Sequence, residues 1–77
     1  MINKNVFAER LREQRLLKGF TQKEMAEAIG VSERSYLSYE ARDDATMPSL
    51  KYLFAIAEKL CISIDYLLNR TSNPLLN

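Results

Sequence analysis

The polar side chains between residues 32 and 38 have hydrogen-bonding groups that match the edges of nucleic-acid bases. A guanidinium such as that of Arg34 can bond guanine bidentately, and a carboxylate such as that of Glu33 can accept from cytosine. Serine hydroxyls adapt to several partners, and an exposed leucine can contact a thymine methyl. For any one of these side chains, a plain solvated surface is the alternative. Together they form a predicted base-facing set: Ser32, Glu33, Arg34, Ser35, Leu37 and Ser38.

A helix over the same stretch would hold this polar set away from two tyrosines. At roughly 100° per residue, Tyr36, Tyr39 and Glu40 fall on one side of the helix, and Arg34 and Ser38 fall on the other. We assign the two tyrosines to the core rather than to a binding role. The outward face is then narrow and polar, so it fits a groove about 12 Å wide.

A second short helix precedes this one and is separated from it by a turn at Gly30. Thr21-Gln22-Lys23-Glu24 fits a capping box, which begins a helix. The exposed N–H groups at that helix start, together with Gln22, can hold a phosphate. Gly30 supplies the backbone freedom for the turn, and Ser32 caps the helix that follows. The residues expected to face the core from the first helix of the pair are Met25, Ala26, Ala28 and Ile29.

Two helices this short are marginal alone, so the rest of the chain must supply their core. A first helix is predicted from Val6 to Lys18, with Asn3 or Asn5 as its cap and Gly19 after its end. Further helices are predicted from Leu50 to Leu60, after Ser49, and from Ile64 to Asn69, after Ser63. The apolar stripe expected on the fourth helix is Leu50, Leu53, Phe54, Ile56, Ala57 and Leu60.

These patterns predict one all-α domain of five helices over residues 1–69, followed by a tail over residues 70–77. The 77 residues carry 11 basic and 10 acidic side chains, a net charge of +1, so overall charge gives no argument for nucleic acid. There is no histidine, and the single Cys61 leaves no partner for a disulfide or a metal site. We therefore expect no catalysis, no metal and no cofactor. Without a membrane-length apolar run or a signal-peptide core, the expected compartment is the cytoplasm.

The joint spacing of the helix pair resembles the helix-turn-helix of the phage-repressor (XRE-type) family. The residues that carry the resemblance are Gln22, Ala26, Gly30, Val31, Tyr36 and Tyr39. The likeness extends over about residues 7–69, and its motifs lie in all five predicted helices. It implies a lambda-repressor-like DNA-binding domain that docks its third helix in the major groove of double-stranded DNA. It also implies a two-fold homodimer on a palindromic operator.

The resemblance also assigns roles to individual residues. It places Ser32, Glu33, Arg34 and Ser38 against bases, and Gln22 against phosphate. It implies an ion pair between Arg15 and Glu40, for which two independent solvated charges are the alternative. Weaker candidates for backbone contacts are Thr21, Lys23, Arg42 and Lys51.

The sequence departs from the family pattern after the third helix and at Cys61. Asp43 and Asp44 would face phosphates badly, so we expect their loop to bend away from DNA or Arg42 to hold their carboxylates. Cys61 stands where the family has a helix-ending Gly; we expect a buried small hydrophobe there rather than a redox sensor. Gln14 stands where the family often has a core leucine.

Some apolar side chains exceed what one small core absorbs: Tyr66, Leu68, Leu75 and Leu76. We therefore expect helix 5 and the tail to form the dimer surface, with a tail folded on its own domain, or disordered, as the alternative. The function expected is a repressor. An antitoxin or another protein-interaction module is the rival reading, supported by the outward Leu16 and Leu17, and a restriction–modification controller is a further one.

Overall fold

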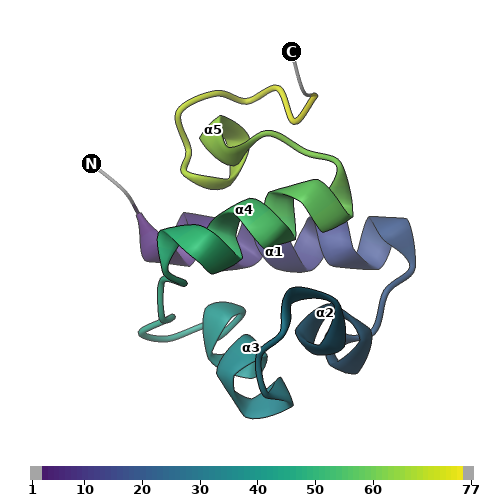
Figure 1. Ribbon diagram of the computed structural model, residues 1–77. Coiled ribbons are helices and arrows are strands. Elements are labelled where there is room, and N and C mark those ends of the chain that lie inside the picture. Colours follow the sequence, from purple (N-terminus) through teal and green to yellow (C-terminus); the bar gives the residue numbers. More distant parts are fainter. Residues whose placement is uncertain (1–2, 76–77) are drawn as a thin grey trace.

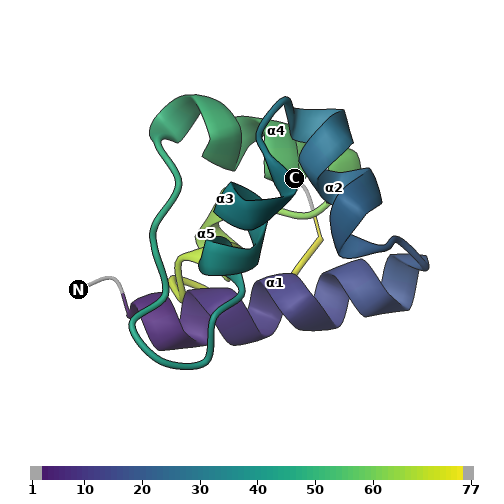
Figure 2. The same cartoon turned by 90° about the horizontal axis from the view of Figure 1, so that it is seen from below.

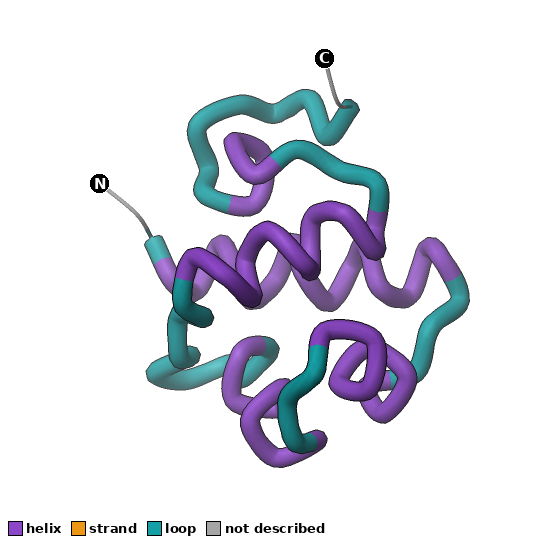
Figure 3. The backbone as a smooth tube through the Cα atoms, viewed as in Figure 1, coloured by secondary structure: helices purple, strands orange, loops and turns teal. Residues whose placement is uncertain are grey.

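The computed structural model describes residues 3–75, and within that part of the chain every regular element is a helix (Figures 1 and 3). The all-α prediction of five helices is confirmed. None of these helices is long and apolar enough to cross a membrane. The elements in order are α1 (Lys4–Lys18), α2 (Gln22–Ile29), α3 (Glu33–Tyr39), α4 (Leu50–Leu60) and α5 (Ile64–Leu67).

The helix ends follow from local capping chemistry. Asn3 caps α1 by accepting from the N–H groups of Asn5 and Val6, so α1 begins two residues before the predicted start. Thr21 and Glu24 form the predicted capping box, and the hydroxyls of Ser32 and Ser63 accept from backbone N–H groups of α3 and α5. Ser49 precedes α4 without a side-chain capping bond. At the other end, α5 stops at Leu67, two residues before its predicted end.

The five helices form three layers. α1 and α4 make the middle layer, with α2 and α3 on one side and α5 with the following segment on the other (Figures 1 and 2). α2 packs against α3 and α4, whereas α5 packs against α1 and α4. The fully buried side chains at the centre are Phe7, Leu11, Met25, Tyr36, Ile56, Leu60, Ile62 and Leu67.

The predicted apolar stripe of α4 is wrong at two positions. Leu50 is 64% exposed and Phe54 is 55% exposed, whereas Ile56 of the same predicted stripe is fully buried. The neighbouring helices approach α4 from the side of Ile56, and the buried face is therefore Leu53, Ile56, Ala57 and Leu60. Packing partners, rather than periodicity, set this rotation.

Two smaller expectations are also wrong. Ala28 is exposed, because the buried face of α2 consists of Met25, Ala26 and Ile29. Cys61 is exposed rather than buried. It ends α4 in the left-handed conformation with φ of 56°, and its backbone N–H closes the last turn. Gln14, in contrast, is only 8% exposed, as its leucine-like position suggested.

The loop between α3 and α4 is anchored at both sides. The Thr46 N–H donates to the Ser38 carbonyl at 2.9 Å, and Ala45 is buried. The loop passes beside the N-terminal end of α1 (Figure 2), where the Asp44 carboxylate contacts the Lys4 ammonium. Lys4 lowers the pKa of Asp44 through this hydrogen bond. Within residues 3–75, the cation that holds an aspartate of this loop is therefore Lys4 and not Arg42.

The segment after α5 folds against its own domain. Nη1 of Arg10 donates to the carbonyls of Tyr66 (2.5 Å) and Thr71 (2.9 Å), and the guanidinium lies 4.2 Å from the centre of the Tyr66 ring. The Ser63 N–H donates to the Pro74 carbonyl at 3.0 Å. The carbonyls of Thr71 and Pro74 thus hold part of this segment against its own domain, whereas Leu75 is 69% exposed. The dimer surface expected at helix 5 and the tail stays a prediction, and Leu76 lies outside the described residues.

Candidate nucleic-acid interface

α3 divides sharply into a buried and an exposed side. Tyr36 is completely buried and Tyr39 is 6% exposed. Their rings meet edge to face, with centroids 6.0 Å apart, a favourable aromatic geometry. Ser32 to Ser35 are exposed, and Leu37 is 42% exposed. The structure therefore brings the predicted base-facing set to one outer surface, with Ser38 half-buried at its edge.

Glu40, directly after α3, lies at the centre of a buried charge network. Its carboxylate accepts from Nε (2.7 Å) and Nη2 (3.0 Å) of Arg15 and from the Tyr36 hydroxyl (2.5 Å). Arg15 is 8% exposed and Glu40 is 4% exposed. The hydrogen bond to Glu40 raises the pKa of Arg15, and burial together with Glu40 raises the pKa of Tyr36 well above its ordinary value. Tyr36 thus remains a proton donor at any physiological pH.

The network also reaches α1 and the start of α2. Nη1 of Arg12 donates to the Glu40 carbonyl (2.9 Å), and Nη1 of Arg15 donates to the Phe20 carbonyl (2.9 Å). Nε2 of Gln22 donates to Oε1 of Glu40 at 3.3 Å. We call Arg12, Arg15, Gln22, Tyr36 and Glu40 the Glu40 network. Among the described residues no buried side-chain polar atom lacks a partner.

The contact of Gln22 with Glu40 was not predicted, because Glu40 lies 18 residues further along the chain and no spacing within one helix reveals the contact. A glutamine amide has two N–H donors and a carbonyl acceptor. Since one N–H bonds Glu40, the second N–H and the carbonyl remain for a ligand. The same contact fixes the direction in which the half-buried amide points.

The exposed set of α3 separates further by hydrogen bonding. Ser32 Oγ accepts from the Ser35 N–H (3.1 Å) and donates to Ser35 Oγ (3.0 Å). Ser38 Oγ donates to the Ser35 carbonyl at 2.6 Å. Within residues 3–75, the side chains of Glu33 and Arg34 have no such internal bond. They are therefore the longest freely available polar groups on this face, with Leu37 beside them.

The candidate phosphate contacts come from three parts of the chain: the start of α2, the loop after α3 and the first turn of α4. Thr21 is committed to the capping box: its Oγ1 accepts from the Glu24 N–H, and its own N–H donates to Glu24 Oε1. Lys23, Arg42 and Lys51 are exposed, and Lys51 lies 5.5 Å from the Tyr52 ring centre. Nowhere in the described part of the chain do three potential metal-binding side chains gather.

Fold, network and exposed α3 face together define a helix-turn-helix domain. The sequence profile of the helix-turn-helix family matches residues 11–67, and the chain belongs to that family. One relative is the cryptic phage CTXphi transcriptional repressor RstR of Vibrio cholerae. It is 44% identical over 62 residues, which cover 80% of this chain and 54% of that protein. The chain thus spans little more than half the length of such curated relatives.

A second relative, SinR of Bacillus subtilis, is similar in structure. Its N-terminal DNA binding domain matches with a TM-score of 0.73 at 31% identity, covering 83% of this chain and 91% of that domain. SinR in complex with DNA matches with a TM-score of 0.71 at 32% identity, covering 80% of this chain and 97% of that chain. SinR in complex with SinI matches with a TM-score of 0.73 at 32% identity, covering 82% and 60%.

Proposed function

We propose that this chain is a transcriptional regulator that binds double-stranded DNA at a specific sequence, with α3 in the major groove. One observation carries the proposal: α3 buries both tyrosines and leaves Glu33, Arg34 and Leu37 exposed on a narrow face. Guanidinium and carboxylate groups on the outer face of a recognition helix discriminate base pairs by hydrogen bonding. The likeness to SinR, which has been solved with DNA, supports the same assignment.

The contacts to the DNA backbone would come from the rim of this face. Gln22 is the principal candidate, because the Glu40 contact orients its amide and leaves an N–H free. The exposed cations Lys23, which precedes α3 in the chain, and Arg42, which follows it, are further candidates. Lys51 is a weaker candidate, and Thr21 is weaker still. Such contacts fix the register of the domain on DNA, while the side chains of α3 select the sequence.

The regulatory mode we propose is repression. Two copies would occupy the two halves of a palindromic operator, whose symmetry mirrors that of a dimer, and would block the promoter sterically. The relative RstR is itself a transcriptional repressor.

The deciding experiment is selection of bound sequences from random duplex DNA with the full chain. We expect an enriched site made of two inverted half-sites about 10 base pairs apart, one helical turn. An unenriched pool would overturn sequence-specific binding. A single enriched half-site without an inverted copy would support sequence-specific DNA binding but overturn the palindromic operator.

A protein-interaction role, as an antitoxin or adaptor, is the second candidate. Leu16 is 62% exposed and Leu17 is 75% exposed. They border an open groove of about 590 Å³ that Gln14 and Tyr66 also line. SinR has been solved with a second protein, SinI. Two results together would favour this function. A partner protein should co-purify with the chain and be lost in Leu16→Glu and Leu17→Glu, and selection from random duplex DNA should enrich no site.

A further inference from the structure

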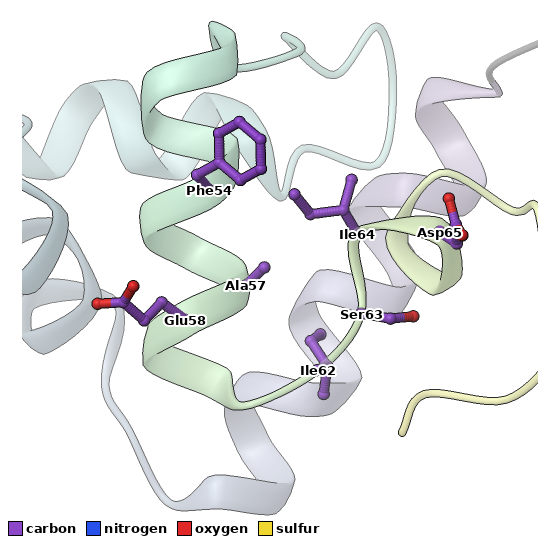
Figure 4. A pocket seen from close by; sticks show the side chains of 7 residues that line it. All are labelled: Phe54, Ala57, Glu58, Ile62, Ser63, Ile64 and Asp65. Carbon is purple, nitrogen blue, oxygen red and sulfur yellow. The ribbon is translucent and has the colours of Figure 1, made fainter. Parts of the chain in front are cut away.

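α4 presents an apolar surface that the domain leaves uncovered. Leu50 and Phe54, one turn apart on the same face, are 64% and 55% exposed. Phe54 borders a groove between α4 and the segment entering α5, with a volume of about 430 Å³. The apolar lining includes Ala57, Ile62 and Ile64, and Glu58 and Asp65 lie at its rim (Figure 4). Side chains of this size rarely stay exposed together without a partner.

The charges beside this surface have a symmetric arrangement along α4. Lys51 and Glu58, both exposed, are seven residues apart and lie on the same side, roughly 10 Å apart along the axis. Their midpoint falls at Phe54 and Ala55. Among residues 3–75 neither of them forms an ion pair, whereas Asp65 lies 3.6 Å from Nε of Arg70.

We propose that this surface binds a second copy of the chain, with the two α4 helices antiparallel about a two-fold axis near Phe54. A two-fold interface uses the same patch on both copies. An antiparallel pair centred between Phe54 and Ala55 brings Lys51 of each copy level with Glu58 of the other. Leu50 of each copy then lies over the groove formed by Ala57, Ile62 and Ile64 of its partner. The pattern is complementary to itself, and this favours a second copy over an unrelated protein.

This interface deepens the proposed function and rests on it, since an operator dimer needs a contact of this kind. It is proposed in place of the dimer surface expected at helix 5 and the tail, where the carbonyls of Thr71 and Pro74 are bonded to the chain's own domain. It also assigns Lys51 to the partner copy rather than to a phosphate. Because dimerisation is measured without DNA, its outcome is separate from that of the DNA-binding test.

The experiment is sedimentation equilibrium of the full chain, without DNA, over a concentration series reaching about 1 mM, the range of weak association. We expect a monomer–dimer equilibrium that Phe54→Glu abolishes. Leu17→Glu is the matched control, because it adds the same charge at an apolar residue of α1 that is 75% exposed, against 55% for Phe54. It should leave the dimer unchanged, and circular dichroism checks that each variant is folded.

Charge exchange gives the second readout. Lys51→Glu should weaken the dimer roughly tenfold, because each two-fold interface then contains two repulsive pairs, and Glu58→Lys should do the same. The double variant Lys51→Glu with Glu58→Lys should restore wild-type association. A monomer at every concentration, a dimer lost in Leu17→Glu, or a double variant no better than the single ones would each overturn the proposal.

Discussion

Glu40 accepts side-chain hydrogen bonds from three residues that lie far apart in the sequence: Arg15, Gln22 and Tyr36. A carboxylate that is 4% exposed depends on its cation, because water cannot replace the lost partner. The network therefore fixes α1, the start of α2 and the end of α3 relative to one another. At the scale of single residues, the geometry of the exposed face depends on this buried charge.

Replacing the cation of the network tests this dependence. Arg15→Met should lower the free energy of unfolding by ~3–5 kcal/mol, since it strands a buried carboxylate. Urea denaturation measures the change. Arg12→Met is the control, because it removes one hydrogen bond to the Glu40 carbonyl and should cost only ~1 kcal/mol. Equal costs for the two variants would contradict the assignment.

On the exposed side, Arg34 and Gln22 should affect DNA binding differently. Arg34→Ala should cost ~1–3 kcal/mol on the selected site and relax the preference at one base pair. Gln22→Ala should weaken specific and random DNA by a similar factor, because phosphates carry no sequence. Fluorescence anisotropy with both duplexes measures this split, with Arg70→Ala, an exposed arginine beyond α5, as control. If Arg34→Ala lowered the affinity for both duplexes by the same factor, Arg34 would not contribute to base recognition.

At the scale of helices, α1 and α4 end in the same left-handed conformation with different residues. Gly19 has φ of 80° and Cys61 has φ of 56°. Only glycine adopts this region without steric strain. The helix end at Cys61 therefore holds local strain that the end at Gly19 does not.

Exchanging the residue types should move stability in opposite directions. Cys61→Gly should stabilise the domain by ~0.5–1 kcal/mol, which raises Tm by roughly 2–8 °C in a domain of this size. Gly19→Ala should destabilise by a similar amount, and backbone strain is its sole cause because an added Cβ meets no atom within 4 Å. Thermal unfolding followed by circular dichroism compares both with wild type. A lower Tm for Cys61→Gly would contradict the strain argument.

The capping box of α2 predicts a pH dependence. The hydrogen bond from the Thr21 N–H lowers the pKa of Glu24 below its ordinary value of 4.5. A depressed pKa in the folded state means that the stabilisation is present above that ordinary value. It is lost as pH falls through the folded pKa. Glu24→Gln should therefore flatten the decline of Tm between neutral and acidic pH, whereas Glu27→Gln, an exposed carboxylate of the same helix, should not.

Local chemistry explains why the helices could be predicted from the sequence. Asn3, Thr21, Ser32 and Ser63 cap their helices through neighbours two or three residues away, so short patterns contain the whole signal. The failures have the opposite cause. Whether Phe54 or Ile56 faces the core depends on where other helices approach α4, and no periodicity within α4 encodes that direction.

The candidate site divides in the same way. The exposed side chains of α3 and the inward direction of Tyr36 and Tyr39 were predicted, because both follow from one helical wheel. The bond between Gln22 and Glu40 and the contact between Lys4 and Asp44 join different segments, so the sequence alone did not indicate them. The pairing of Arg15 with Glu40 was expected from the family resemblance, and the helical wheels supported it because they place both residues toward the interior.

For the whole molecule, a net charge of +1 leaves DNA affinity to local contacts. If a dimer neutralises ~6–10 phosphates, affinity should fall about 10³–10⁵-fold between roughly 50 and 200 mM salt. A titration series on the selected duplex measures the slope. An affinity independent of salt would argue against phosphate contacts and favour the protein-binding alternative.

The hydrogen bonds from Arg10 to α5 and the segment after it have a consequence for folding during synthesis of the chain. Arg10 belongs to the first helix of the domain, yet its two acceptors are the carbonyls of Tyr66 and Thr71, far later in the chain. Domains generally fold as units during synthesis of the chain. The hydrogen bonds of Arg10 can therefore all form only after residue 71 has emerged from the ribosome. We expect the domain to fold as one unit rather than helix by helix.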